Sequence, residues 1–313
     1  MSGILSILIG SAAGSAAGSA AAAASGTQKA IFGYGSNAVI DLSMTNLVSN
    51  TGVVSLDVGG VGVIRSFLAA AGYGTDKAIF GFGSVASNLW TFSLVSNTGA
   101  VGSDSTVPNS SAKYYLAAAG YGGDKALFGF GLRGDKLSVV NLVSNTGVVA
   151  DETSGVGTPR LALAAAGYGG DKAIFGYGRT APSVVSITSL VSNTGVVAAD
   201  VTGVGTAREY LAAAGYGGDK AIFGYGNTTI AVSITNLVSN LGVVSADVTG
   251  VGTNRRLLAA AGYGGDKAIF GYGNTTIAVS ITNLVSNLGV VSADVTGVGT
   301  ARYGLAAAGY SLT

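Results

Sequence analysis

A sixteen-residue phrase, LAAAGYGGDKAIFGYG at Leu211–Gly226, recurs along the chain in close copies. The lysine of this phrase occurs at six positions: Lys29, Lys77, Lys125, Lys172, Lys220 and Lys267. The successive spacings between these lysines are 48, 48, 47, 48 and 47 residues. A regular period of this size indicates a repeat architecture in which each repeat is one supersecondary unit. The fold must therefore be built from six copies of one unit.

Each repeat contains four short segments that favour β-strands. The first two, LAAAGY and KAIFGY, are separated by a glycine-containing turn of hairpin length. The third, such as Ser183–Ser192, is followed by NTG or NLG and then by a fourth segment such as VVAADV. A three-residue loop that ends in glycine suits a type I turn closed by a left-handed residue. The frequent glycines argue against helices, because each would cost about 1 kcal/mol.

Four antiparallel strands in 47–48 residues match the size of a propeller blade. The sequence therefore predicts an all-β fold, a six-bladed β-propeller of four-stranded blades over residues 27–313. A β-helix is the alternative, but its coils are shorter and usually lack an NTG hairpin. The small residues of AAAG fit the crowded axis of a propeller, where the inner strands of all blades converge.

The two ends of the repeat array predict how the ring closes. The first full copy begins in its second strand at Lys29, whereas the chain ends near LAAAGYSLT, which is a first strand. We expect this C-terminal strand to complete the first blade, because an open ring would leave unpaired blade edges. Ala21–Gln28 is a weaker candidate for the same place, since it has lost the tyrosine.

The pattern ARxxLAAAGYGGDKAIFGYG, followed by a Thr–Asn strand and a turn, resembles the kelch repeat. The resemblance covers Lys29 to Tyr310 and implies a propeller, but it transfers no binding residues. The kelch glycine doublet is here Gly–aromatic–Gly, and Trp90 is the only tryptophan of the chain. We expect Trp90 to lie in a third strand and to pack between blades. The repeat arrays are also similar to those in predicted virion proteins of bacteriophages.

Residues 1–26 precede the repeats and are rich in Ala, Gly and Ser, with no charged side chain before Lys29. A secretory signal needs a basic start, which is missing. Gly10, Gly14 and Gly18 form a GxxxGxxxG pattern, which lets two helices approach closely. Three interpretations stay open: a helix that packs into a homo-oligomer or larger assembly, a membrane anchor over Ile4–Ala24, or a flexible tail.

The composition excludes several function classes. The chain has no His and no Cys, so it predicts no disulfide, no zinc site of Cys/His type and no imidazole catalysis. Its net charge is +1 and no basic face is apparent, which argues against nucleic-acid binding. Glu152, Glu209 and the repeated aspartates form no asymmetric cluster of acid, base and nucleophile. We expect no catalytic residue, no metal and no cofactor.

A basic residue occurs three positions before each LAAA segment: Arg65, Lys113, Arg160, Arg208, Arg255 and Arg302. Six cations at one channel mouth could bind an anion. We favour a structural role, in which each cation bonds carbonyls or carboxylates of its own or the next blade. An aspartate eight or nine positions upstream is available in every repeat: Asp57, Asp104, Asp151, Asp200, Asp247 and Asp294. The Asp–Lys pairs beside the first hairpin turn indicate turn chemistry.

The repeats differ from one another mainly after GYG and just after the basic residue. Because antiparallel strands alternate in direction, both variable segments must lie on one face of the disk. Aromatic and arginine side chains are the usual anchors of recognition surfaces, and relaxed drift of a loop face is the alternative. The candidate binding residues are Phe67, Tyr114, Tyr115, Arg133, Lys136, Arg179, Glu209, Tyr210, Arg256 and Tyr303.

These observations predict a non-enzymatic structural or recognition module. The resemblance to phage proteins implies a virion appendage or tail component that presents one propeller face to a host-surface glycan or protein, or to a neighbouring subunit. The N-terminal segment would join it to other subunits of the virion. The alternative is a membrane-anchored or secreted cell-surface propeller that binds glycans. A propeller enzyme is a third and more distant hypothesis.

Overall fold

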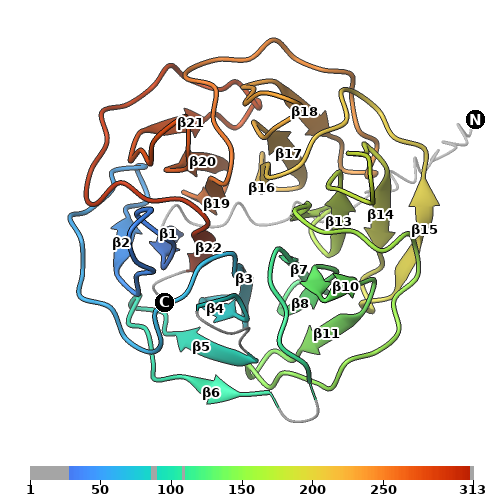
Figure 1. The fold of residues 1–313 in the computed structure, drawn as a ribbon, viewed down its shortest axis with the longest axis horizontal. Coiled ribbons are helices and arrows are strands. Elements are labelled where there is room, and N and C mark those ends of the chain that lie inside the picture. The colour runs from blue at the N-terminus through green and yellow to red at the C-terminus, as the bar shows by residue number, and fades with distance from the viewer. Residues whose placement is uncertain (1–27, 86–89, 108–109, 311–313) are drawn as a thin grey trace, which may run out of the picture.

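The computed structural model describes residues 28–85, 90–107 and 110–310. They form six antiparallel sheets around a common axis, a six-bladed β-propeller (Figure 1). Every regular element in these ranges is a β-strand. The predicted fold class is confirmed.

The innermost strand of every blade is an AAAGY segment that runs along the axis. These strands are β3 (Ala69–Tyr73), β7 (Ala117–Tyr121), β12 (Ala164–Tyr168), β16 (Ala212–Tyr216), β19 (Ala259–Tyr263) and β22 (Ala306–Tyr310). Their glycines pack on the backbone of the neighbouring blade: a methyl group on Gly72 would lie 3.1 Å from the carbonyl oxygen of Gly309. Crowding at the axis therefore explains the small residues.

The second strands are KAIFG or KALFG segments, and four of their five residues are buried in each blade. They are β1 (Lys29–Gly33), β4 (Lys77–Gly81), β8 (Lys125–Gly129), β13 (Lys172–Gly176), β17 (Lys220–Gly224) and β20 (Lys267–Gly271). The third strands are β2 (Thr45–Val48), β5 (Thr91–Val95), β11 (Val140–Val143), β14 (Thr188–Val191), β18 (Thr235–Val238) and β21 (Thr282–Val285). A second strand is covered by strands on both edges and by blades on both faces, so it has no polar side chain after its first residue, a lysine.

The fourth, outer strand is regular in only two blades, as β6 (Ser105–Thr106) and β15 (Val197–Val201). Elsewhere the outer segment makes two isolated bridges to the third strand, such as Val48 with Val54 and Thr45 with Val58. The outer segment thus has one residue more than β2 between the two bridges, which is a β-bulge. Ser55 lies in the bulge, where its Oγ accepts a hydrogen bond from the amide of Leu47 at 2.9 Å. The predicted fourth strand is therefore a regular strand in two blades and is reduced to two bridges in the other four.

The C-terminal strand closes the ring, as predicted. β22 pairs antiparallel with β1, so that Ala30 lies opposite Gly309 and Gly33 opposite Ala306. Figure 1 shows the red end of the chain beside its blue beginning. One blade is thus made from both ends of the sequence.

The hydrophobic core consists of layers between adjacent blades, and each layer includes the aromatic residue of one Gly–aromatic–Gly motif. In the blade of β17, Gly224 leaves room for a ring of the next blade, because a methyl group there would lie 2.7 Å from Phe270. Tyr225 follows with a left-handed φ of 63° and packs edge-on against the same ring at 5.1 Å. Gly226 completes the bend with a φ of 109°. The motif therefore joins neighbouring blades.

The predicted anchoring segment 1–26, with Gly10, Gly14 and Gly18, lies outside the described residues. In the part of the chain that is described, no helix is long and apolar enough to cross a membrane.

Candidate functional site

The six basic residues lie inside the disk, between the blades. The side chains of Arg65, Lys113, Arg160, Arg208, Arg255 and Arg302 are fully buried. Each cation lies over the aromatic ring of a Gly–aromatic–Gly motif, at 4.2 to 4.7 Å from the ring centre. An open ring of cations that could bind an anion at a channel mouth is therefore absent from this part of the molecule.

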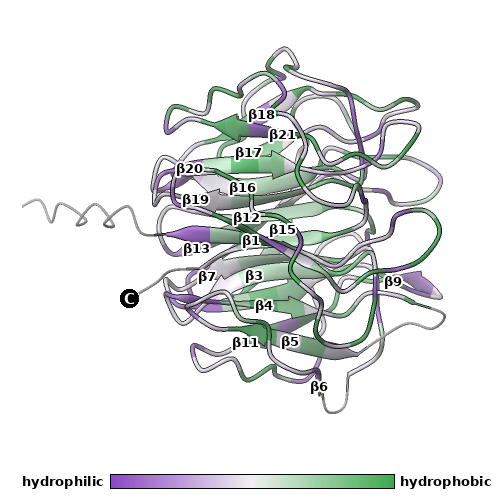
Figure 2. Cartoon of the chain, turned by 90° about the vertical axis from the view of Figure 1, so that its left-hand side faces the viewer, coloured by the Kyte–Doolittle hydropathy of each residue, from purple (hydrophilic) through white to green (hydrophobic). Residues whose placement is uncertain are grey.

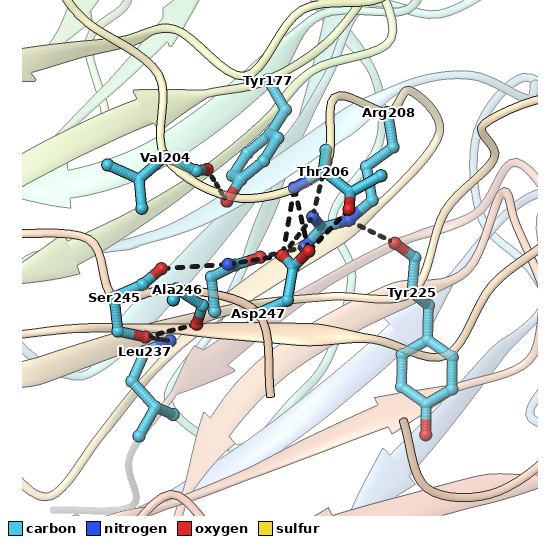
Figure 3. Close-up of polar contacts among 10 residues, drawn as sticks. Tyr177, Val204, Thr206, Arg208, Tyr225, Leu237, Ser245, Ala246 and Asp247 are labelled. Atoms are coloured by element: carbon cyan, nitrogen blue, oxygen red, sulfur yellow. Dashed lines mark hydrogen bonds and ion pairs between the residues drawn. The ribbon is translucent and has the colours of Figure 1, made fainter. Parts of the chain in front are cut away.

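Figure 3 shows one such blade joint, formed around Arg208. The guanidinium of Arg208 stacks on Tyr177 of the preceding blade and donates to the carbonyl of Tyr225 at 2.8 Å. It also donates to Asn236 Oδ1 at 2.7 Å and to the carbonyl of Thr206 at 3.0 Å. The joint thus fastens two blades and the segment that connects them.

The acidic partner in each joint comes from the blade that follows the basic residue. Asp247 lies 3.9 Å from Arg208 and accepts hydrogen bonds from the amide and hydroxyl of Thr206. Partial burial opposes ionisation of Asp247, but the bonds from Thr206 and Asn236 and the charge of Arg208 keep its pKa below the usual range. The expected partner eight positions upstream, Asp200, instead pairs with Arg160 at 3.0 Å.

One joint has a different composition. Lys113 replaces arginine, Phe82 replaces tyrosine, and Glu152 rather than its neighbour Asp151 supplies the carboxylate, 3.3 Å from Nζ. Burial lowers the pKa of Lys113 to about 8, although Glu152 partly opposes the shift. Arg133 also binds Glu152, at 2.8 Å.

The two variable segments of each repeat pair with each other on one face of the disk, here called the loop face. The residue after the basic residue bridges the residue after the Gly–aromatic–Gly motif, as in Tyr114 with Leu132 and Glu209 with Asn227. Figure 2 shows β9 (Leu132–Arg133) on the opposite side of the disk from the hydrophilic start of β13. That opposite side, which carries the hairpin turns, is the hairpin face.

A closed ring of backbone hydrogen bonds surrounds the axis at the loop face. It is made by the second residue after each basic residue, and we call these six residues the axial belt: Phe67, Tyr115, Ala162, Tyr210, Leu257 and Gly304. Each amide donates to the carbonyl of the equivalent residue in the preceding blade, at 2.7 to 2.9 Å. The ring runs through all six blades, including the one that joins both chain ends.

All six belt residues have a left-handed backbone, with φ between 54° and 62°. Such a φ costs a residue with a side chain roughly 1–2 kcal/mol, and only glycine adopts it freely. The belt nevertheless has glycine at one position only and an aromatic residue at three. The geometry is imposed by the hydrogen-bonded ring, whereas the side chains vary from blade to blade.

Five of the predicted binding residues form one aromatic cluster at the belt. The ring centres of Phe67 and Tyr115 are 4.5 Å apart, and those of Tyr115 and Tyr210 are 5.5 Å apart. Tyr114 lies 4.9 Å from Tyr115, and Tyr303 lies 6.4 Å from Phe67. All five side chains are half-buried. Burial raises the pKa of the Tyr115 hydroxyl well above its usual range, and Tyr210 and Tyr114 add to the effect.

Three charged predicted residues surround the cluster near Tyr210. Arg179 grips the buried carboxylate of Glu209 with two hydrogen bonds, of 2.7 and 2.6 Å. Arg256 donates to Asn227 at 3.3 Å, and its Nε is buried without a partner. This bidentate, charge-assisted pair holds the Arg179 and Glu209 side chains in place beside the aromatic cluster.

The remaining predicted residues lie apart from the belt. Arg133 belongs to β9 and Lys136 to β10 (Asp135–Lys136), a short hairpin between β8 and β11. Trp90 precedes β5 and is 49% exposed, so the prediction that it lies in a third strand and packs between blades was wrong. Its carbonyl oxygen, one residue before the third strand begins, accepts a hydrogen bond from the amide of Val107.

The floor of the loop-face mouth is apolar. One leucine per blade lies beneath the belt: Leu68, Leu116, Leu163, Leu211, Leu258 and Leu305. Together with the belt they line a cavity of about 70 Å³. The leucines are almost completely buried.

The hairpin face has a larger and more polar mouth, with a cavity of about 320 Å³. Lys77, Lys125, Lys172, Lys220 and Lys267 line it, and each binds the preceding aspartate. Gln28 stands where the sixth aspartate would be, and its carbonyl accepts a bond from Gly264 at 2.8 Å. Because each of the five lysines that line this mouth pairs with the preceding aspartate, the mouth is not a built anion site.

The sequence singled out these aromatic residues as candidates, but it did not predict the axial belt. Hydrogen bonds between blades cannot be inferred from the sequence of one repeat. Among the residues that the structure describes, no group of acidic side chains could hold a metal ion. No protein-family model matches this sequence, and no curated protein is similar to it.

Proposed function

We propose that this chain is a non-enzymatic recognition module whose loop face binds its partner through the aromatic cluster at the axial belt. One observation carries the proposal. At equivalent, left-handed belt positions the chain uses Ala162 and Gly304 in two blades but Phe67, Tyr115 and Tyr210 in three others. The residues that carry these aromatic side chains have a strained, left-handed backbone, and the side chains are only half-buried. Core packing therefore does not account for them, whereas partner binding does.

The opposite placement of attachment and recognition supports the proposal. Gln28, where the described part of the chain begins, lies in the mouth of the hairpin face. The aromatic cluster lies at the other end of the axis. If residues 1–27 attach the chain to an assembly, the loop face is directed away from the point of attachment.

The setting of such a module follows from the resemblance of the repeats to kelch arrays in predicted phage virion proteins. We place it in a virion appendage or tail, where it would contact a host surface or a neighbouring subunit. The half-buried aromatic cluster suits equally a membrane-anchored or secreted cell-surface propeller that binds glycans, which is the second candidate.

The test is binding of labelled full-length protein to a glycan array and to intact bacterial cells. The variant Tyr114→Ser/Tyr115→Ala/Tyr210→Ala should reduce binding by at least about tenfold, because central aromatic residues dominate recognition surfaces. The replacements copy Ser66 and Ala162, which occupy equivalent positions in other blades. They should therefore leave the fold intact, which circular dichroism and the unfolding midpoint would check.

Lys172→Ala/Lys220→Ala on the hairpin face serves as the control and should bind like the unmodified protein. Equal binding by the aromatic variant, or no binding by the unmodified protein to either target, would count against a recognition role of the loop face.

A further inference from the structure

The cavity inside the axial belt accepts an apolar group and disfavours a polar one. Its floor is the ring of six leucines, and its wall includes Phe67, Tyr115, Tyr210 and Leu257. The amides and carbonyls of the belt are already bonded to one another. A sugar hydroxyl or a charged group entering here would lose its water without gaining a backbone partner.

The cavity is also small. At about 70 Å³ it has room for a single aliphatic side chain, not for a helix or a strand. Around it lie half-buried tyrosines and the Arg179–Glu209 pair, which can shield a bound side chain from water. An apolar centre with an aromatic and arginine surround is the arrangement of a binding hot spot.

The chain itself contains a segment of matching chemistry. Ile4, Leu5, Ile7, Leu8 and Ile9 form an apolar run, which small and uncharged residues separate from the propeller. Eighteen residues lie between Ile9 and Gln28, which allows a reach of at most about 65 Å. The run therefore has both the side chains and the length to enter such a cavity.

The exit point of the segment decides which copy it reaches. Gln28 lies at the hairpin-face mouth, and the leucine-floored cavity is a separate one at the loop face. The segment thus starts on the far side of the disk from its own axial cavity. A second copy stacked on the same axis, loop face toward this hairpin face, presents its cavity directly to the segment.

We propose that one aliphatic side chain of the Ile4–Ile9 run of one copy inserts into the axial cavity of a second copy, so that disks stack head to tail. The contact joins two different surfaces and does not close on itself, so it generates an open column of disks. This inference rests on the proposed role of the loop face as a recognition surface, and it names the neighbouring copy as a partner.

The test is sedimentation velocity of the full-length chain over a range of concentrations. We expect species larger than a monomer whose fraction increases with concentration. A variant with serine at Ile4, Leu5, Ile7, Leu8 and Ile9 should sediment as a monomer. Leu257→Asp should weaken association at least about tenfold, because it places a carboxylate in the cavity wall. Aspartate tolerates a left-handed backbone, so the belt should persist.

Leu56→Asp is the matched control, since Leu56 is 76% exposed in an outer segment away from both mouths, and it should associate normally. As a direct readout, a fluorescent peptide of residues 1–13 should bind the serine variant and lose affinity with the additional Leu257→Asp change.

A monomeric unmodified chain, or undiminished association of the serine variant or of Leu257→Asp, would overturn the proposal. So would a peptide that fails to bind. The cell and glycan assay on the serine variant separates the two proposals. If the serine variant still binds cells or glycans, and this binding still requires the tyrosines of the loop face, the recognition role is retained even where self-association is disproved.

Discussion

Two rings of left-handed residues circle the same axis, one in the blade joints and one at the axial belt. The joint ring consists of the central residues of the six Gly–aromatic–Gly motifs: Tyr34, Phe82, Phe130, Tyr177, Tyr225 and Tyr272. Its φ values of 61° to 65° hardly differ from the 54° to 62° of the belt. Yet all six joint residues are aromatic and fully buried, whereas the belt ranges from glycine to tyrosine.

The difference separates what the architecture demands from what it leaves free. In both rings the backbone conformation is set by contacts between blades. In the joints a cation and a neighbouring ring also fix the side chain. At the belt the backbone is bound in the same way in all six blades, whereas the side chains differ from blade to blade. Uniform positions thus mark what the architecture requires, and the unequal positions are those at which we propose recognition.

The largest expected effect breaks a joint. Tyr225→Ala should lower the free energy of unfolding by about 3–5 kcal/mol, as for other buried aromatic residues. Tyr225 is fully buried, lies 4.3 Å from Arg255 and donates to the carbonyl of Val251 at 3.1 Å. Tyr210→Ala at the belt should cost less than about 1 kcal/mol. Urea denaturation compares the two, and equal losses would contradict the division between the rings.

The atypical joint at Lys113 should make stability depend on pH. Its pKa of about 8 in the folded state lies below the ordinary value of 10.5. Above pH 8 the folded chain therefore releases this proton first and the unfolded chain binds more protons, so stability rises with pH. The gain should reach about 2 kcal/mol at pH 9.5.

Lys113→Arg should abolish this gain, because arginine stays charged over the whole range. Lys220→Arg, at an exposed lysine of the hairpin face, provides the control. The free energy of unfolding, measured between pH 7 and 9.5, gives the difference between each variant and the unmodified chain. A flat difference for Lys113→Arg would show that Lys113 is not electrostatically disfavoured in its joint.

The blade count, the closure by the C-terminal strand and the alanine-lined axis could be predicted from the sequence. They follow from the period and from side-chain size, which a single chain displays directly. The joint could be predicted only in part. A structural role for Arg208, with partners in its own or the next blade, was predicted, but the carboxylate expected was Asp200, eight positions upstream, whereas the structure pairs Arg208 with Asp247.

Contacts between blades account for the other differences as well. The bulge beside Ser55 depends on the pairing of the outer segment, which residue type alone does not determine. The left-handed backbone of Tyr225 and Tyr210 was unforeseen because tyrosine ordinarily avoids it. Trp90 was misplaced because its repeat departs from the others just before the third strand. Positions that depart from the repeat were the hardest to place.

The smallest expected effect measures the belt conformation itself. Ala162 in the belt and Ala166 in β12 are both buried, at 5% and 4% exposed, but only Ala162 has a left-handed φ, of 55°. Changing each to glycine removes the same methyl group and adds the same freedom to the unfolded chain. These two contributions therefore cancel when the two variants are compared. What remains is the strain that glycine relieves at Ala162, so Ala162→Gly should be more stable than Ala166→Gly by about 1 kcal/mol. Equal stability of the two variants in urea would mean that the belt imposes no strain. The aromatic residues in it would then need no partner to explain them.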